Sequence, residues 1–79
     1  MTMVRSLNDI GREIRLDWGA KINFAAKPYL AAMMGMGDIN EQFGYDSGRS
    51  IVLYFLSNAS TWRGAVAKRV KAELRGMLK

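Results

Sequence analysis

The sequence predicts an all-α fold, a compact single-domain bundle of about four helices plus a short helical turn, spanning residues 1–79. Three observations predict it. A chain of 79 residues has room for one small domain. Its composition, with 49% hydrophobic residues, 24% charged residues and one proline, is typical of a chain that folds. Apolar residues also recur at helical spacing, and the sequence offers no second convincing strand with which a first strand would pair.

The first helix is predicted over residues 6–18. Its apolar positions are spaced three and four residues apart, which places them on one helix face: Leu7, Ile10, Ile14 and Trp18. Ser6 and Asp9 are placed to cap the start of this helix, and Gly19 is placed to end it.

The second helix is predicted to end near Gly35 and Gly37, and Pro28 leaves two choices for its start. It begins either near Lys27, with the proline in its first turn, or at Asn23 with a bend. In both cases the buried side of this helix consists of Tyr29, Leu30, Met33 and Met34.

A helix of one or two turns is predicted over residues 38–43, because Asp38 and Glu41 form an acidic capping box and Gly44 offers a left-handed stop. A central helix over about 47–58 follows. Its residues 51–56 are apolar on all sides, and periodicity alone assigns such a run either to a buried strand or to a buried helix. The lack of a partner strand favours a helix that the others surround.

The last helix is predicted to run to about residue 78 after a cap at Ser57, Asn58, Ser60 or Thr61. One side of it is apolar: Trp62, Val66, Val70, Leu74 and Met77, with Ala67 and Leu78 at the margin. A basic stripe lies opposite: Lys68, Lys71, Arg75 and Lys79. Residues 1–60 carry six basic and six acidic side chains, so residues 61–79 carry the whole net charge of +5.

Residue types exclude most familiar catalytic chemistry. The chain contains no cysteine and no histidine, which removes thiolate chemistry, the usual metal ligand and the usual general base near neutral pH. Asp9, Glu13 and Asp17 lie four residues apart and would line one helix face as a metal site or an acid/base pair. Basic residues three or four positions away favour ordinary surface ion pairs instead: Arg5, Arg12 and Lys21. We expect no catalytic residues, no metal site, no cofactor and no enzyme activity.

The basic stripe is the most informative functional feature of the sequence. Four cations on one exposed helix face would complement an acidic protein surface or follow the phosphate backbone of a nucleic acid. Solubility alone is a third explanation. The stripe contains no aromatic residue for base stacking, and the last helix offers few polar side chains that read base edges. Sequence-specific recognition of DNA is therefore disfavoured.

Four further residues are candidates for partner contact: Tyr45, Arg49, Trp62 and Arg63. Tryptophan and arginine dominate binding hot spots, and Tyr45 is a second aromatic candidate close to Arg49 in the sequence. Two of the four also have a structural explanation. Trp62 would pack inside as the first apolar residue of the last helix, and Arg63 would bond carbonyl groups at the end of the preceding helix.

The sequence gives no sign of a membrane segment. Its longest apolar runs, residues 29–34 and 51–56, have six residues each, against about 20 for a membrane-spanning helix. The first residues lack the apolar core and small-residue cleavage site of a signal peptide. We expect a cytoplasmic protein with no membrane partner.

Three segments resemble small proteins encoded on phages and integrative mobile elements of bacteria. They are residues 27–33 (KPYLAAM), 46–64 (DSGRSIVLYFLSNASTWRG) and 66–74 (VAKRVKAEL), and together they cover about half of the chain. Some compact proteins of that origin are anti-CRISPRs, which bind a CRISPR effector complex and block target binding or cleavage. The resemblance implies such an inhibitor and assigns no catalytic residue. DNA-mimicking inhibitors are acidic, whereas this chain is basic, so an acidic or RNA-rich target surface is expected.

The sequence thus predicts a non-enzymatic binding protein of mobile-element origin that inhibits a CRISPR effector. Its partner is expected to be a host protein or ribonucleoprotein complex. The alternative is a basic nucleic-acid-binding protein that uses the C-terminal helix. A third hypothesis is a homo-oligomer that buries residues 33–36, which include Met33, Met34 and Met36.

Overall fold

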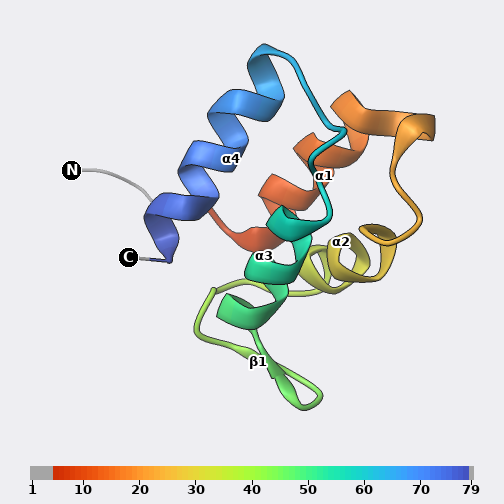
Figure 1. Cartoon of the computed structure of the whole chain (residues 1–79). Coiled ribbons are helices and arrows are strands. Elements are labelled where there is room, and N and C mark those ends of the chain that lie inside the picture. Colours follow the sequence, from red (N-terminus) through yellow and green to blue (C-terminus); the bar gives the residue numbers. More distant parts are fainter. Residues whose placement is uncertain (1–4, 79) are drawn as a thin grey trace.

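Four α-helices and one small hairpin make up the part of the chain that the computed structural model describes, residues 5–78 (Figure 1). In chain order the elements are α1 (Leu7–Trp18), the 3-10 helix η1 (Gly19–Lys21), α2 (Lys27–Met34), β1 (Gln42–Phe43), β2 (Asp46–Ser47), α3 (Gly48–Ser57) and α4 (Ala65–Met77). The fold is therefore mainly helical, and the prediction of a purely helical protein is wrong at residues 42–47.

The boundaries of α1 and α2 follow from their end residues. The Ser6 side chain accepts a hydrogen bond from the Asp9 amide, and Gly19 ends α1 with a φ of 59°, which confirms the predicted helix over 6–18. α2 starts at Lys27 with Pro28 in its first turn, so the first of the two predicted starts is correct. Proline has no amide hydrogen, and the first turn of a helix does not use its amide hydrogens for bonds within the helix.

Residues 38–43 do not form the predicted helical turn. Glu41 accepts hydrogen bonds from the amides of Gly37 and Asp38, as in a capping box. However, the Asp38 carboxylate accepts from the Asn40 amide, which closes a tight turn, and the chain then enters an antiparallel hairpin. Gly44 has a φ of 64° at the first position of the two-residue hairpin turn, where a type II′ turn needs a positive φ. The sequence Gly44–Tyr45 is the turn signal that the helical interpretation missed.

α3 confirms the predicted central helix over about 47–58, although one side of it faces solvent. The Ser47 side chain caps its start by accepting a hydrogen bond from the Ser50 amide. Ile51, Val52 and Phe55 are buried. Leu53 and Tyr54 are about half exposed, at 53% and 49%, so the prediction that other helices surround α3 on all sides is wrong.

α4 begins later than the capping pattern predicts. Its first residue, Ala65, follows Gly64, which has a φ of 113° and contributes no side-chain cap. Asn58 ends α3 instead of starting α4. Residues 58–64 form a connecting segment, from which Trp62 packs into the core.

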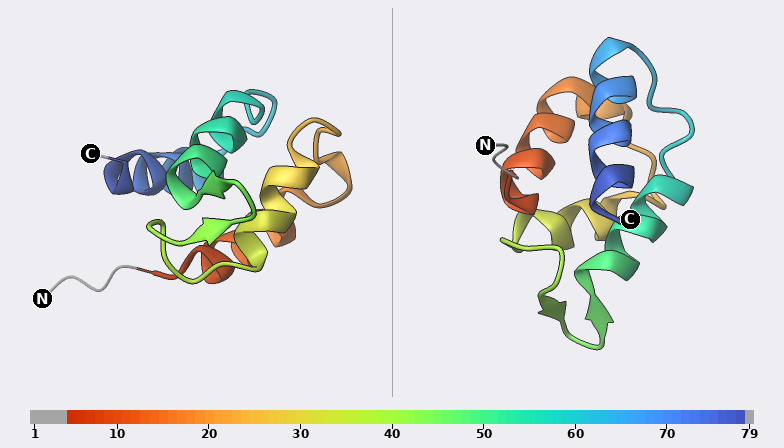
Figure 2. Two further views of the ribbon diagram at one scale, coloured as in Figure 1. Left: turned by 90° about the horizontal axis from the view of Figure 1, so that it is seen from below. Right: turned by 90° about the vertical axis from the view of Figure 1, so that its left-hand side faces the viewer.

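One hydrophobic core joins the four helices. Its aromatic centre contains Trp18, which stacks on Trp62 with 5.7 Å between ring centroids and meets Phe55 edge-on. α1 packs against both α2 and α4, and α2 packs against α3. The hairpin projects from one end of this assembly (Figure 2). Met33 and Met36 are buried in the core, so they do not form the surface that the oligomer hypothesis requires.

None of the helices within residues 5–78 combines the length and the apolar character that crossing a bilayer requires. The predicted cytoplasmic location is not tested by this observation and stays a prediction.

Candidate partner-binding surface

The solvent side of α4 carries two exposed cations that lie two helical turns apart. They are Lys68 and Arg75, seven positions apart in the sequence, which is about 10 Å along a helix axis. The fourth residue of the predicted stripe, Lys79, lies outside the described residues. Two further exposed arginines continue this surface: Arg63 precedes the N-terminal end of α4, and the Arg49 guanidinium donates a hydrogen bond to the Leu78 carbonyl just beyond its C-terminal end.

We define the α4 basic face as Lys68, Arg75, Arg63 and Arg49. Within residues 5–78 none of these four makes an ion pair. The structure therefore brings together two residues of the predicted stripe, Lys68 and Arg75, with Arg63 and Arg49. Tyr45 lies apart, fully exposed in the turn of the hairpin.

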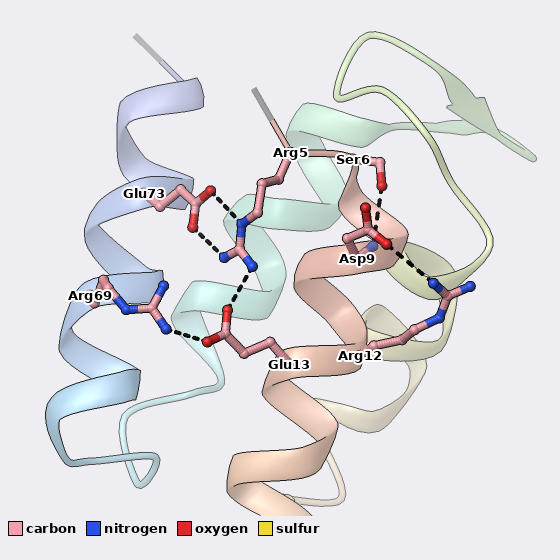
Figure 3. Close-up of polar contacts among 7 residues, drawn as sticks. All are labelled: Arg5, Ser6, Asp9, Arg12, Glu13, Arg69 and Glu73. Atoms are coloured by element: carbon pink, nitrogen blue, oxygen red, sulfur yellow. Dashed lines mark hydrogen bonds and ion pairs between the residues drawn. The ribbon is translucent and has the colours of Figure 1, made fainter. Parts of the chain in front are cut away.

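The other flank of α4 is occupied by an ion-pair network that joins it to α1 (Figure 3). The Arg5 guanidinium donates to both carboxylate oxygens of Glu73, at 2.9 and 2.5 Å. It also lies 2.7 Å from a carboxylate oxygen of Glu13, which Arg69 contacts from α4. The hydrogen bond to Glu73 raises the pKa of Arg5, and hydrogen bonds from Arg69 and Arg5 lower the pKa of Glu13.

This network separates the charges of α4. Glu73 is the only acidic residue in residues 61–79, and it is directed toward Arg5. Arg69, which lies on the same flank, is paired with Glu13. The opposite flank of the helix consequently presents cations with no carboxylate of α4 beside them.

Lys71 does not belong to the exposed surface in the way that the stripe predicts. Its ammonium group donates a 2.6 Å hydrogen bond to the Trp62 carbonyl and lies 5.9 Å from the centroid of the Trp62 ring. Burial lowers the pKa of Lys71, and the charges of Arg75 and Arg63 lower it further. Lys71 is half-buried and ties α4 to the segment before it, so its predicted exposed position is wrong, and its predicted partner contact stays a prediction.

Trp62 is also corrected, because its side chain is only 2% exposed and cannot present its ring to a partner. Its indole Nε1 donates a 2.9 Å hydrogen bond to the Asp17 carboxylate. The structural explanation that the sequence left open for Trp62 is the one observed, although Trp62 precedes α4 instead of lying within it.

The three acidic residues of α1 do not converge on one site. Asp9 pairs with Arg12 at 3.2 Å, Glu13 pairs with Arg5 and Arg69, and Asp17 accepts from Trp62. No group of three or more histidine, cysteine or acidic side chains suited to a metal ion exists within the described residues 5–78. These carboxylates act in packing and ion pairing.

A groove between α1 and α2 was missed at the sequence level. It is lined by Arg12, Arg15, Leu16 and Met34. The signal that points to it is Leu16, an apolar residue placed off the apolar face of α1 and 86% exposed.

Comparisons of the chain with protein-family models, with curated proteins and with solved structures find no match. The resemblance to mobile-element proteins stays a prediction, and the functional argument depends on the surface itself.

Proposed function

We propose that this protein is a non-enzymatic binding protein that engages an acidic partner through the α4 basic face. The observation that carries the proposal is the direction of Glu73 toward Arg5, which leaves Lys68 and Arg75 exposed without an opposing carboxylate on their helix. Exposed cations that lack intramolecular partners favour association with an acidic surface and speed up encounter with it.

The partner that we propose is a protein or ribonucleoprotein with an acidic surface, of which a CRISPR effector complex is the leading example. The acidic character of the partner follows from the α4 basic face. The choice of a CRISPR effector derives from the resemblance of residues 27–33, 46–64 and 66–74 to mobile-element proteins. In this function the chain acts as an inhibitor by occupying a surface, which requires no catalytic group.

A charge reversal tests the proposal. The double variant Lys68→Glu with Arg75→Glu should weaken capture of a purified effector complex by more than about tenfold. Both side chains are exposed, so the fold should persist. Lys21→Glu with Lys27→Glu is the matched control, because it reverses two exposed charges outside the α4 basic face. Equal capture by the double variant and the wild-type protein would contradict the proposal.

Direct nucleic-acid binding is the second candidate function, because exposed cations without an ion pair, such as Lys68 and Arg75, also bind the phosphates of a nucleic acid. A salt titration with free duplex and single-stranded RNA separates the two functions. Affinity for free nucleic acid that falls steeply with salt supports this candidate, and capture of the complex without such affinity supports the first.

A further inference from the structure

We propose that the groove between α1 and α2 is a second docking surface, and that its occupant is an acidic amphipathic segment of a partner protein, bound as a helix. The groove has a volume of about 520 Å³ and is lined by Arg12, Arg15, Leu16 and Met34. It lies outside the α4 basic face, so it extends the proposed function to a second contact and does not depend on the first.

The close approach of α1 and α2 places Met34 at the groove. Gly11 lies on the α1 face that meets α2, and a Cβ atom at position 11 would lie only 2.8 Å from the Met34 Cγ atom. Met34 is half-buried there and lines the groove beside α1. Its unbranched, flexible side chain adapts to apolar groups of different shapes.

Leu16 supplies an apolar contact that the fold itself leaves uncovered. The side chain is 86% exposed, whereas Ile14 and Trp18 of the same helix are buried in the core. A leucine on the polar side of a helix contributes nothing to the hydrophobic core of the protein. It does provide apolar area that a partner can bury. Leu16 and Met34 together form the apolar part of the groove.

Two arginines line the same groove. Within residues 5–78 Arg15 makes no ion pair, and Arg12 is held by the exposed Asp9 carboxylate alone. Such an exposed pair contributes little and exchanges readily for a carboxylate of a partner. Figure 3 shows Arg12 on the side of α1 away from α4.

Apolar contacts and two arginines in the same groove select the class of occupant. An amphipathic helix with leucine-like anchors and flanking Asp or Glu residues covers Leu16 and pairs with Arg15 at the same time. A phosphate backbone would satisfy the arginines and leave Leu16 uncovered. A second copy of the chain would bring its own net charge of +5 against this basic groove.

A synthetic peptide tests the proposal directly. The probe is a helix of roughly 16 residues with leucines along one face and glutamates beside them. The matched peptide replaces every glutamate with lysine. Fluorescence anisotropy should show binding of the acidic peptide, and amide and methyl NMR shifts should move at Arg15, Leu16 and Met34. Leu16→Glu should weaken binding about tenfold, and Arg15→Glu should weaken it about fivefold.

Two controls separate this surface from others. Leu53→Glu changes a half-exposed leucine of α3, and Lys68→Glu changes the α4 basic face. Both variants should bind the acidic peptide as the wild-type protein does. Circular dichroism of Leu16→Glu and Arg15→Glu shows whether each variant is folded. If only one of them folds, its affinity for the peptide still tests the proposal.

Four outcomes of the binding experiments would overturn the assignment, and a fifth concerns self-association. They are unchanged affinity in both groove variants, equal binding of the lysine peptide, equal weakening by Leu53→Glu, and duplex RNA that shifts the groove resonances where the acidic peptide does not. Self-association that Leu16→Glu abolishes, without peptide binding, would assign the groove to a second copy and would also overturn it. Lys68→Glu with Arg75→Glu should still bind the peptide, so failure of the proposed function and failure of this inference are distinguishable.

Discussion

At the scale of single residues, Trp62 connects more of the fold than any residue of its own segment. It stacks on Trp18, meets Phe55 edge-on, donates to Asp17 and accepts a bond from Lys71 through its carbonyl. These contacts join α1, α3 and α4 in one place. Trp62 therefore contributes to the stability of the fold and not to contact with a partner.

Truncation of this side chain should be among the most destabilising single changes. Trp62→Ala should lower the free energy of unfolding by about 3–5 kcal/mol, because it removes a large buried ring. Trp62→Phe should cost about 1–2 kcal/mol, since it keeps an aromatic ring and loses the hydrogen bond to Asp17. Urea unfolding measures both values. A loss below 1 kcal/mol for the alanine variant would contradict the packing, if the denaturant slope is unchanged.

Two buried glycines should respond differently to the same substitution. A Cβ atom at Gly48 would lie 2.4 Å from the Ile39 carbonyl oxygen, which is backbone and cannot move away cheaply. Gly48→Ala should therefore cost about 2 kcal/mol or more. At Gly11 the Cβ atom would meet the flexible Met34 side chain, and alanine also favours the helix by up to about 1 kcal/mol. Gly11→Ala should change stability by less than about 1 kcal/mol. Thermal unfolding of the two variants checks this order.

At the scale of elements, the segment before α1 is bound to α4 through Arg5. One guanidinium contacts carboxylates of Glu13 and Glu73, which belong to different helices. The side chains of this network are about one quarter to one half exposed, so each pair alone contributes little. Their shared effect is to direct the acidic group of α4 toward α1.

The network makes stability sensitive to acid through Glu13. Its pKa is lowered in the folded protein, first by the hydrogen bond from Arg69 and then by that from Arg5. A carboxylate with a lowered folded pKa stabilises the fold above its unfolded pKa, about 4.3, and loses that contribution as pH falls through the folded value. The urea midpoint should therefore fall with pH below about 4.3. Glu13→Gln should flatten this part of the profile, and an unchanged slope would show that Glu13 is not responsible.

At the scale of the whole molecule, positive and negative charges occupy different parts of the fold. Residues 28–48 contain three acidic side chains and no lysine or arginine, and they include the hairpin. Residues 61–79 carry the whole net charge of +5 and include α4. An acidic partner should accordingly approach α4 or the arginines of α1 and not the hairpin.

The shared core should also make unfolding a single transition. Both tryptophans lie in the same cluster with Phe55, so their fluorescence reports on the core that holds the helices. Unfolding curves from tryptophan fluorescence and from far-ultraviolet circular dichroism should coincide. Amide exchange should be fastest in residues 38–47, which contain few buried side chains, and slowest in α1 and α3. Separate transitions by the two probes would contradict a single cooperative core.

The sequence by itself determined the elements whose cause is local. Apolar spacing defined α1, Ser47 and the apolar run located α3, and Pro28 was compatible with the first turn of α2. The excess of lysine and arginine near the C-terminus likewise needed no structure to be recognised. Periodicity shows which side chains three or four residues apart share a helix face. The predicted helices and the basic C-terminal segment depend only on residues this close in the sequence.

Only the tertiary structure decided which charged and aromatic groups are available to a partner. Glu73 meets Arg5 across 68 residues, and Trp62 meets Asp17 across 45. Such contacts depend on how helices pack, and no local pattern encodes them. Packing likewise buried Trp62, engaged Lys71 and left Leu16 exposed. The physical reason is that burial of a side chain is a property of two surfaces together, whereas a sequence pattern describes only one of them.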